Sequence, residues 1–336
     1  MKRKITFIVN PKSGTNNKEE IVKLIPETID SSRYEWRLKY VEREGHCEEL
    51  ARDAVRRHAD AVVAVGGDGT VNGVACGLVG TDTALGIVPC GSGNGLARHL
   101  QLPMDAEKAL QVINDMQIIR ADHCKINDHL FFCTCGVGFD AYVSDRFAKA
   151  GKRGMLTYME QMVNIAREYD SEDYELEIDG EKMSVNAFLI TCGNASQYGN
   201  NVFIAPEASL TDGYIDAIVM LPFKKIHSGR VIYQMLNRTI TDRKNVHLYR
   251  CKHIVIKRQA PGVIHCDGDP FDEEAVLDIS IVPSSISMIC GNRNLYSNNA
   301  LTNAFNEISD KIGSDIRSNN RRIMRINKEL LGLLKK

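Results

Sequence analysis

The chain has 336 residues, of which 43% are hydrophobic and 25% charged, as in an ordinary globular protein. Its 42 Lys and Arg residues are balanced by 43 Asp and Glu residues. Nucleic-acid-binding proteins usually carry a basic excess, so no nucleic-acid partner is expected. No apolar run is long enough for a membrane span. The ten cysteines form no C-x-x-C pair, so reduced thiols in a cytoplasmic protein are expected rather than a zinc site.

Short apolar runs alternate with helical patterns in the first third of the chain. Strands are predicted at residues 5–9, 34–40, 61–65 and 84–88, and helices at 18–29 and 47–58. Most of these strands are continuously apolar, which is typical of strands buried on both faces. The order predicts an N-terminal α/β doubly wound domain with a parallel sheet, whose ligands bind beyond the carboxyl ends of the strands.

The pattern changes near residues 122–128. A helical segment at 141–169 is followed by β-like runs at 174–178, 183–191, 214–220, 245–258, 263–266 and 275–282. Asp179-Gly180, between the first two runs, is typical of a tight hairpin. This half is therefore predicted to be a C-terminal antiparallel β-sandwich domain, and the last residues are predicted to form a helical extension.

A glycine-rich turn follows the third predicted strand and precedes a helical run. Its sequence is Gly66-Gly67-Asp68-Gly69-Thr70. Glycine lets a phosphate approach the backbone N–H groups without a Cβ in the way, and a helix N-terminus adds further donors. Asp68 could cap the helix that follows, or act through Mg²⁺ on a nucleotide phosphate.

Two similar turns end other strands of the same predicted sheet. Gly91-Ser92-Gly93-Asn94-Gly95 follows the fourth strand, and Asn10-Pro11-Lys12-Ser13-Gly14 follows the first. Three such turns on one edge predict a broad anion site suited to a triphosphate. The G-x-x-x-x-G-K-[ST] motif is absent, and Asn72 stands where the dinucleotide fingerprint needs glycine, so a dehydrogenase is disfavoured.

The three turns, in this order, resemble the diacylglycerol kinase/sphingosine kinase family of lipid kinases. Further matching segments are Asp122, residues 135–141, Lys152-Arg153-Gly154, residues 205–213 and residues 265–270. The resemblance runs from residue 4 to residue 290. It implies a nucleotide-binding domain at 1–125 and a lipid-binding domain at 126–295.

The resemblance also implies an activity and a set of site residues. The expected reaction is transfer of the γ-phosphoryl group of ATP, with Mg²⁺, to the hydroxyl of a diacylglycerol or a sphingoid long-chain base. Asp267 would take the proton from the lipid hydroxyl, and Asp68 would also be catalytic. The expected nucleotide-binding residues are Asn10, Lys12, Gly14, Gly67, Asp68, Gly69, Thr70, Gly91, Ser92, Gly93, Asn94, Arg153 and Asp269. Asp212 would hold a structural Mg²⁺ or form a plain Asp-Gly turn, and Arg153 would neutralise phosphate or lie in a solvated turn.

Two positions depart from the family pattern. Asp269 stands where the family has Glu, one methylene longer, which puts its reach to the nucleotide in question. Gly95 stands where bacterial diacylglycerol kinases often carry Asp, and a small residue there is more similar to the sphingosine and ceramide branch. This difference slightly favours a long-chain base as the expected substrate.

Residues 296–336 form the predicted extension. Apolar residues recur at helical spacing, and residues 301–336 contain eight Lys or Arg against four Asp or Glu. Such a basic amphipathic helix packs on the first domain, pairs with a second copy of the chain, or lies on an anionic membrane. A homodimer and peripheral association with a membrane, where the lipid substrate resides, are therefore expected.

Two other functions remain open. NAD kinases share the glycine-rich turn around Asp68, although their second loop differs from residues 91–94. A catalytically silent lipid- or nucleotide-binding protein is the other alternative. The intact Asp68, Asn94 and Asp267 argue against it, and Asp269 is the one weak indication in its favour.

Overall fold

The computed structural model describes residues 2–14, 18–150, 165, 166, 168–242 and 244–291. All of these belong to one compact unit. The predicted helical extension at 296–336 therefore lies outside the described residues.

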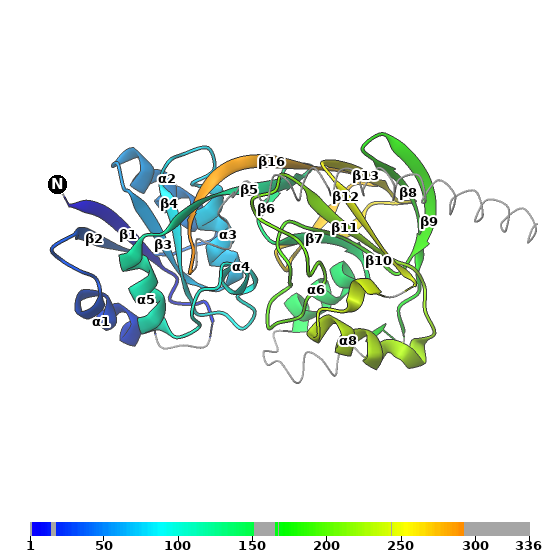
Figure 1. The fold of residues 1–336 in the computed structure, drawn as a ribbon, viewed down its shortest axis with the longest axis horizontal. Coiled ribbons are helices and arrows are strands. Elements are labelled where there is room, and N and C mark those ends of the chain that lie inside the picture. Colours follow the sequence, from blue (N-terminus) through cyan, green and yellow to red (C-terminus); the bar gives the residue numbers. More distant parts are fainter. Residues whose placement is uncertain (1, 15–17, 151–164, 167, 243, 292–336) are drawn as a thin grey trace, which may run out of the picture. The chain divides into compact units, whose positions relative to one another are not determined.

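The N-terminal part of the chain forms a parallel sheet (Figure 1). Its strands are β1 (Arg3–Val9), β2 (Tyr34–Tyr40), β3 (Ala61–Gly66) and β4 (Ala84–Pro89). They lie in the order β2-β1-β3-β4, and every neighbouring pair is parallel. The continuously apolar strands β3 and β4 are buried along their whole length. The four strands predicted from the sequence are confirmed.

Helices cover both faces of this sheet. They are α1 (Lys18–Thr28), α2 (His46–Arg56), α3 (Asp68–Cys76), α4 (Gly95–His99) and α5 (Ala106–Asp115). Alternate strand residues such as Phe7 and Val63 pack with Ile25 of α1 and Ile113 of α5. Helices α2 and α3 pack together, apart from α1 and α5. This arrangement confirms the predicted doubly wound α/β architecture.

Two long strands extend this sheet into the second half of the chain. They are β5 (Ile118–Ile126) and β16 (Val276–Ile289), which pair antiparallel, while the end of β16 pairs parallel with β4. Asp122 lies within β5, where its carboxylate accepts hydrogen bonds from the backbone N–H groups of Gly213 (2.8 Å) and Ser284 (2.7 Å). The sheet thus runs through residue 125, and a domain boundary there stays a prediction.

The second half forms the predicted antiparallel β-sandwich. One layer is the sheet β12-β11-β10-β7-β14-β15. Its strands are β7 (Thr134–Gly138), β10 (Leu189–Gly193), β11 (Ile215–Met220), β12 (Val246–Cys251), β14 (Gly262–Cys266) and β15 (Asp269–Glu273). The other layer contains β5, β6 (His129–Phe131), β8 (Glu172–Ile178), β9 (Glu181–Ala187), β13 (His253–Lys257) and β16. The core between the layers includes Ile190, Val219, Ile254 and Leu277.

Two predicted strands of this half were wrong in extent. The run at 183–191 is two strands, β9 and β10, and the run at 245–258 is also two, β12 and β13. In each case the chain crosses from one layer of the sandwich to the other at a single residue, Phe188 or Lys252. Both segments keep a β-like pattern across the crossing, so periodicity alone does not reveal it. The Asp179-Gly180 hairpin is confirmed, with φ of 45° and 87°.

Helices cover the outer face of the six-stranded sheet. They are α6 (Phe139–Ala150), the 3₁₀ turn η1 (Lys225–His227), α8 (Ser228–Leu236) and the 3₁₀ turn η2 (Ile240–Asp242). An apolar cluster joins α6, the sheet and α8 through Phe139, Phe188, Met220, Val231 and Met235. The predicted helix at 141–169 corresponds in its first part to α6, and residues 151–164 lie outside the described residues. Helix α8 was not predicted.

Among the helices that the structure describes, none combines the length and apolar character needed to cross a bilayer. Eight of the ten cysteines are buried and two are partly buried, as their apolar sequence surroundings predict.

Candidate active site

The three glycine turns meet at the carboxyl ends of β1, β3 and β4. A Cβ atom on Gly14, which has φ of +68°, would lie 1.8 Å from the carbonyl oxygen of Cys90. A Cβ atom on Gly91 would lie 2.7 Å from the Cα atom of Gly67. Glycine is thus required for the turns to approach this closely. The sequence predicted correctly that they lie side by side.

Asp68 links the glycine turn at residues 66–70 to the glycine turn at residues 91–95. Its carboxylate accepts hydrogen bonds from the backbone N–H groups of Asn94 (2.8 Å) and Gly95 (2.8 Å), which begin helix α4. Asp68 therefore caps the neighbouring helix α4, whereas it is itself the first residue of α3. Burial raises the pKa of Asp68 to about 6; the two N–H groups oppose this shift, and the charges of Asp267 and Asp269 add to it.

Four of the expected nucleotide-binding residues lie outside the cavity wall. Asn10 donates a hydrogen bond to the Thr70 hydroxyl (3.1 Å) and so ties two turns together. The Asn94 side chain both accepts from the N–H group of Gly91 (2.9 Å) and donates to its carbonyl oxygen (2.8 Å). The exposed Lys12 donates only its backbone N–H, to Asn10. Asn10, Thr70 and Asn94 are thus placed to shape the turns.

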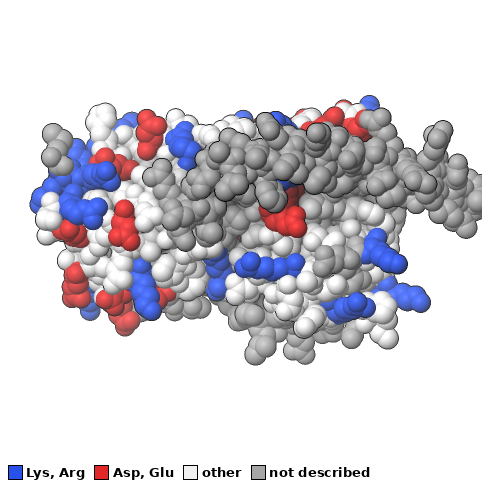
Figure 2. All heavy atoms as spheres, in the orientation of Figure 1, with Lys and Arg blue, Asp and Glu red and all other residues white. Residues whose placement is uncertain are grey.

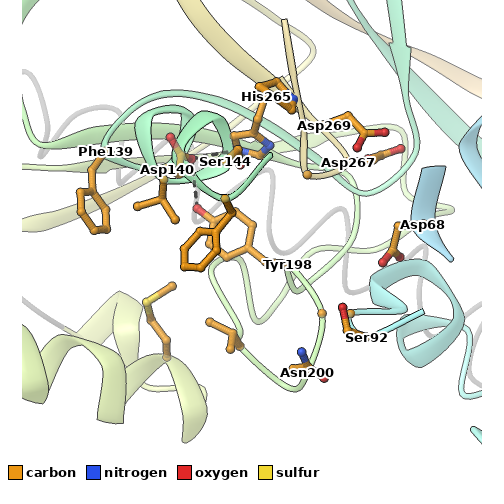
Figure 3. A pocket seen from close by; sticks show the side chains of 18 of the residues that line it. Asp68, Ser92, Phe139, Asp140, Ser144, Tyr198, Asn200, His265, Asp267 and Asp269 are labelled. Carbon is orange, nitrogen blue, oxygen red and sulfur yellow. Dashed lines mark hydrogen bonds and ion pairs between the residues drawn. The ribbon is translucent and has the colours of Figure 1, made fainter. Parts of the chain in front are cut away.

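A cavity of about 460 Å³ begins at these turns and continues beneath α6 and α8 (Figure 3). Its polar edge is formed by Ser13, Gly14, Gly67, Asp68, Gly69, Gly91, Ser92, Gly93, Asp267 and Asp269. Its other part, which we call the apolar chamber, is lined by Phe139, Val143, Phe147, Phe188, Val202, Met220, Phe223, Val231, Ile232 and Met235. One cavity thus joins a polar, glycine-lined edge to an apolar space.

Asp267 occupies a two-residue hairpin between β14 and β15. Its φ of 51° and the φ of 93° at Gly268 are those of a tight Asp-Gly turn. Its carboxylate accepts four hydrogen bonds, from the backbone N–H groups of Phe132 (3.0 Å), Cys133 (2.7 Å) and Thr134 (3.1 Å) and from the Asn72 side chain (2.9 Å). A carboxylate offers about four lone-pair positions, so all of them are used. Burial raises the pKa of Asp267, and these hydrogen bonds oppose the shift.

Asp269 faces the turn that contains Asp68. A Cβ atom on Gly69 would lie 3.1 Å from the Asp269 Oδ2 atom. Burial raises the pKa of Asp269, and the neighbouring charge of Asp267 raises it further. The shorter side chain at position 269 therefore still reaches the polar edge of the cavity.

A hydrogen-bonded cluster in the cavity wall was not assigned a role from the sequence. Asp140 Oδ2 accepts hydrogen bonds from Thr191 (2.5 Å), Tyr198 (3.1 Å) and His265 Nε2 (3.0 Å). In Figure 3 this cluster lies between Phe139 and the carboxylates of the polar edge. Asp140 and His265 stand in segments that carry the family resemblance, so a sequence signal existed, but it did not show that they meet.

The loop after β10 packs against the glycine turn at residues 91–95. Gly199, with φ of +118°, leaves room for the Gly93 backbone, and the Asn200 N–H group donates to the Gly93 carbonyl oxygen (3.0 Å). A Cβ atom on Gly95 would lie 3.2 Å from both Cys133 Sγ and the Gln197 carbonyl oxygen. The absence of an acidic residue at position 95 therefore has a local steric cause.

Two expected site residues lie elsewhere. Arg153, with Lys152, is outside the described residues. Asp212 does not line the cavity; it accepts a hydrogen bond from the Tyr214 N–H group (3.0 Å) and pairs with Arg250. The described residues contain no group of three or more His, Cys, Asp or Glu side chains placed to hold a metal ion. A structural Mg²⁺ at Asp212 stays a prediction.

Comparisons with known proteins identify the family of the chain. Residues 4–126 match the family model of the diacylglycerol kinase catalytic domain, and residues 133–290 match that of the YegS C-terminal NAD kinase beta sandwich-like domain. A diacylglycerol kinase of Mycobacterium tuberculosis is 28% identical over 249 residues, which cover 71% of this chain and 80% of that protein. An uncharacterized Synechocystis protein is 29% identical over 302 residues, which cover 84% of this chain and 69% of that protein.

The fold is shared with a crystal structure of a Bacillus anthracis diacylglycerol kinase. The TM-score is 0.64 at 17% identity, with 86% of this chain and 97% of that chain covered. Fold, cavity and family matches together define a lipid kinase. The chain belongs to the diacylglycerol kinase family.

The raised pKa of Asp68 predicts a pH-dependent stability. The folded protein binds this proton more tightly than the unfolded chain, so the contribution of Asp68 to the free energy of unfolding is largest at low pH. It is lost as pH rises from 3.8, the ordinary pKa, through about 6. Relative to Asp68→Asn, which does not titrate, the wild-type free energy of unfolding should fall by about 2 kcal/mol between pH 4 and 7.

Urea unfolding of both proteins across this pH range measures the difference. The other raised carboxyl groups, such as Asp122 and Asp216, are present in both proteins and cancel in the comparison. A difference between wild type and Asp68→Asn that stays constant with pH would show that Asp68 titrates normally.

Proposed function

We propose that this lipid kinase transfers the γ-phosphoryl group of ATP to the hydroxyl of a diacylglycerol or a sphingoid long-chain base. The observation that carries the proposal is the single cavity in which a glycine-lined, acid-bearing edge opens into the apolar chamber. A lipid acceptor needs both parts, because its hydroxyl must meet the phosphate while its hydrocarbon chain is kept from water.

The chamber favours a lipid over NAD as the acceptor. Its wall carries Phe139, Phe188 and Phe223 among other apolar side chains. A dinucleotide placed there would lose water from its polar groups without gaining hydrogen bonds in return, which is costly. The name diacylglycerol kinase, printed for the Mycobacterium tuberculosis relative, points in the same direction.

The polar edge suits a nucleotide triphosphate. The glycine turns bring backbone N–H groups close to the cavity, and helix α3 begins at this edge. The charges of Asp267 and Asp269 raise the pKa of Asp68, and the charge of Asp267 raises the pKa of Asp269, so a bound cation would relieve this repulsion. Asp269 would hold Mg²⁺ together with phosphate oxygens, as is usual for this ion. Bound Mg²⁺ neutralises the negative charge of the phosphates.

We assign the proton-accepting role to Asp68 rather than to Asp267. All four lone-pair positions of Asp267 are occupied by hydrogen bonds, so its carboxylate anchors the β14–β15 hairpin. Asp68 accepts only two hydrogen bonds and lines the cavity. A pKa of about 6 lets it be ionised at neutral pH and still accept a proton from an alcohol as the phosphoryl group transfers.

The choice between glycerolipid and sphingoid base depends on the chamber rather than on Gly95. A Cβ atom at position 95 would require Cys133 and the Gln197 backbone to shift by a few tenths of an ångström, so packing favours glycine there. The glycine there is accounted for by packing and gives no reason to prefer one lipid.

A transfer assay tests the reaction. Wild-type enzyme with labelled ATP and Mg²⁺ should label a lipid in a mixed-micelle panel of diacylglycerol, monoacylglycerol, sphingosine, dihydrosphingosine, ceramide and NAD. Asp68→Asn should lower turnover by about 10²–10⁴-fold, because the proton acceptor is lost. The matched change Asp272→Asn, at an exposed position of β15 outside the cavity wall, should leave turnover unchanged. Labelled NADP would contradict the proposal, as would ATP binding without any labelled lipid.

Gly91→Ala tests whether the glycine turns hold the nucleotide. The added Cβ would lie 2.7 Å from the Gly67 Cα atom and 2.9 Å from Asn94 Oδ1, so the turns must separate. ATP affinity, measured by calorimetry, should fall at least about tenfold, which corresponds to about 1.4 kcal/mol. Gly229→Ala adds the same methyl group to α8, where no atom lies within 4 Å, and should leave the affinity unchanged. Equal affinities in the two variants would place ATP elsewhere.

A further inference from the structure

Helix α8 and the 3₁₀ turn η1 before it have an inner face that lines the cavity and an outer face that is exposed to solvent. On the inner face, Val231, Ile232 and Met235 line the apolar chamber. On the outer face, Ile226 is 85% exposed and Tyr233 is 65% exposed. Elsewhere in the described part of the chain, the exposed large hydrophobic residues are Tyr40 and Val276. The two outer residues thus gather apolar surface next to the wall of the chamber.

The same segment is strongly basic. Residues 222–244 contain six Lys or Arg (Lys224, Lys225, Arg230, Arg238, Arg243 and Lys244) and one acidic residue, Asp242. The chain as a whole has a net charge of −1, so this excess is local. In Figure 2 the described charged side chains over the region where Figure 1 places α8 are blue.

The basic residues of this segment that the structure describes are all exposed. Lys225 pairs with Asp170 at 3.0 Å, but Asp170 is 91% exposed, and such a surface pair contributes little. Arg238 stacks on the ring of Phe203, with 4.1 Å to the ring centroid. Exposed apolar side chains among basic ones are the features with which a helix lies in the headgroup region of an anionic bilayer.

We propose that η1 and α8, residues Lys225–His227 and Ser228–Leu236, form the surface by which this enzyme docks on an anionic lipid bilayer. The proposal rests on the proposed function, because it gives the acceptor lipid a route into the chamber. Ile226 and Tyr233 enter the headgroup region, and the basic residues bind the anionic headgroups. The chamber on the other side of α8 then receives a lipid hydrocarbon chain directly from the bilayer.

A bilayer fits this surface better than a second copy of the chain does. The commonest dimers are two-fold symmetric and place the same patch of each subunit against the other. That arrangement would bring two basic segments together, and like charges repel. An anionic membrane supplies the complementary charge along with an apolar layer for Ile226 and Tyr233.

Vesicle sedimentation without ATP or substrate tests docking independently of catalysis. Full-length wild type should bind vesicles that contain phosphatidylglycerol and bind pure phosphatidylcholine vesicles weakly, with binding reduced by salt. Ile226→Glu/Tyr233→Glu should lower the partition coefficient at least about tenfold. Lys224→Glu/Arg230→Glu should abolish the preference for phosphatidylglycerol. The control Tyr40→Glu/Val276→Glu changes the other two exposed large apolar residues of the described part of the chain and should bind as wild type does.

Activity measurements separate this proposal from the proposed function. With a short-chain acceptor dissolved as monomers, all variants should match wild type, because none of the changed residues lines the cavity. With the acceptor in vesicles, only the docking variants should lose activity, by about tenfold. A wild type that phosphorylates no lipid contradicts the proposed function and leaves the sedimentation result standing on its own.

Two outcomes would overturn the docking surface. One is equal vesicle binding by the docking and control variants. Binding would then come from a segment that all of them share, such as residues 292–336. The other is a dimer, detected by light scattering, that the docking substitutions convert to a monomer while vesicle binding is unchanged. That result would make α8 a subunit interface.

Discussion

The close approach of three glycine turns, joined through the carboxylate of Asp68, is the constraint on which this site depends. Gly14 lies against Cys90, and Gly91 lies against Gly67, at distances that admit no side chain. Asp68 then bridges two of the turns by accepting hydrogen bonds from the start of α4. Parallel strands deliver all three turns to one edge, and small residues let them close into one surface.

The β14–β15 hairpin and the loop after β10 both connect the β-sandwich to that surface. Asp267, in the β14–β15 hairpin, binds the N–H groups that begin β7 and the Asn72 side chain of α3. The loop containing Gly199 and Asn200 rests on Gly93. These contacts place the apolar chamber next to the polar edge. Carboxylates at this junction are partly removed from water, and their pKa values are raised as a result. Asp68 can therefore exchange a proton near neutral pH.

Much of the fold could be predicted because its signals are local. Continuous apolar runs predicted β1, β3 and β4, alternation predicted β2, and Asp179-Gly180 predicted the β8–β9 hairpin. The crossings at Phe188 and Lys252 could not be predicted, because a strand pattern is the same on either layer of a sandwich. Helix α8 was missed because it has only nine residues and begins without a side-chain cap, although its pattern is amphipathic.

The site was predicted in part for similar reasons. Glycine turns at strand ends show in the sequence, and they converge as expected. The supporting roles of Asn10, Thr70 and Asn94 depend on hydrogen bonds across the turns, which spacing does not reveal. The four hydrogen bonds to Asp267 come from segments more than 130 residues away in the chain. Only the folded structure shows that hydrogen bonds already use the lone pairs of this carboxylate.

A crystal structure with a non-hydrolysable ATP analogue and an acceptor lipid would test the central claim most directly, namely that nucleotide and lipid meet in one cavity. The account predicts the γ-phosphate between the turns at Gly67 and Gly91, the lipid chain among Phe139, Phe188 and Met235, and the lipid hydroxyl within hydrogen-bond distance of Asp68. A nucleotide bound away from the glycine turns, or a lipid bound outside the chamber, would contradict it.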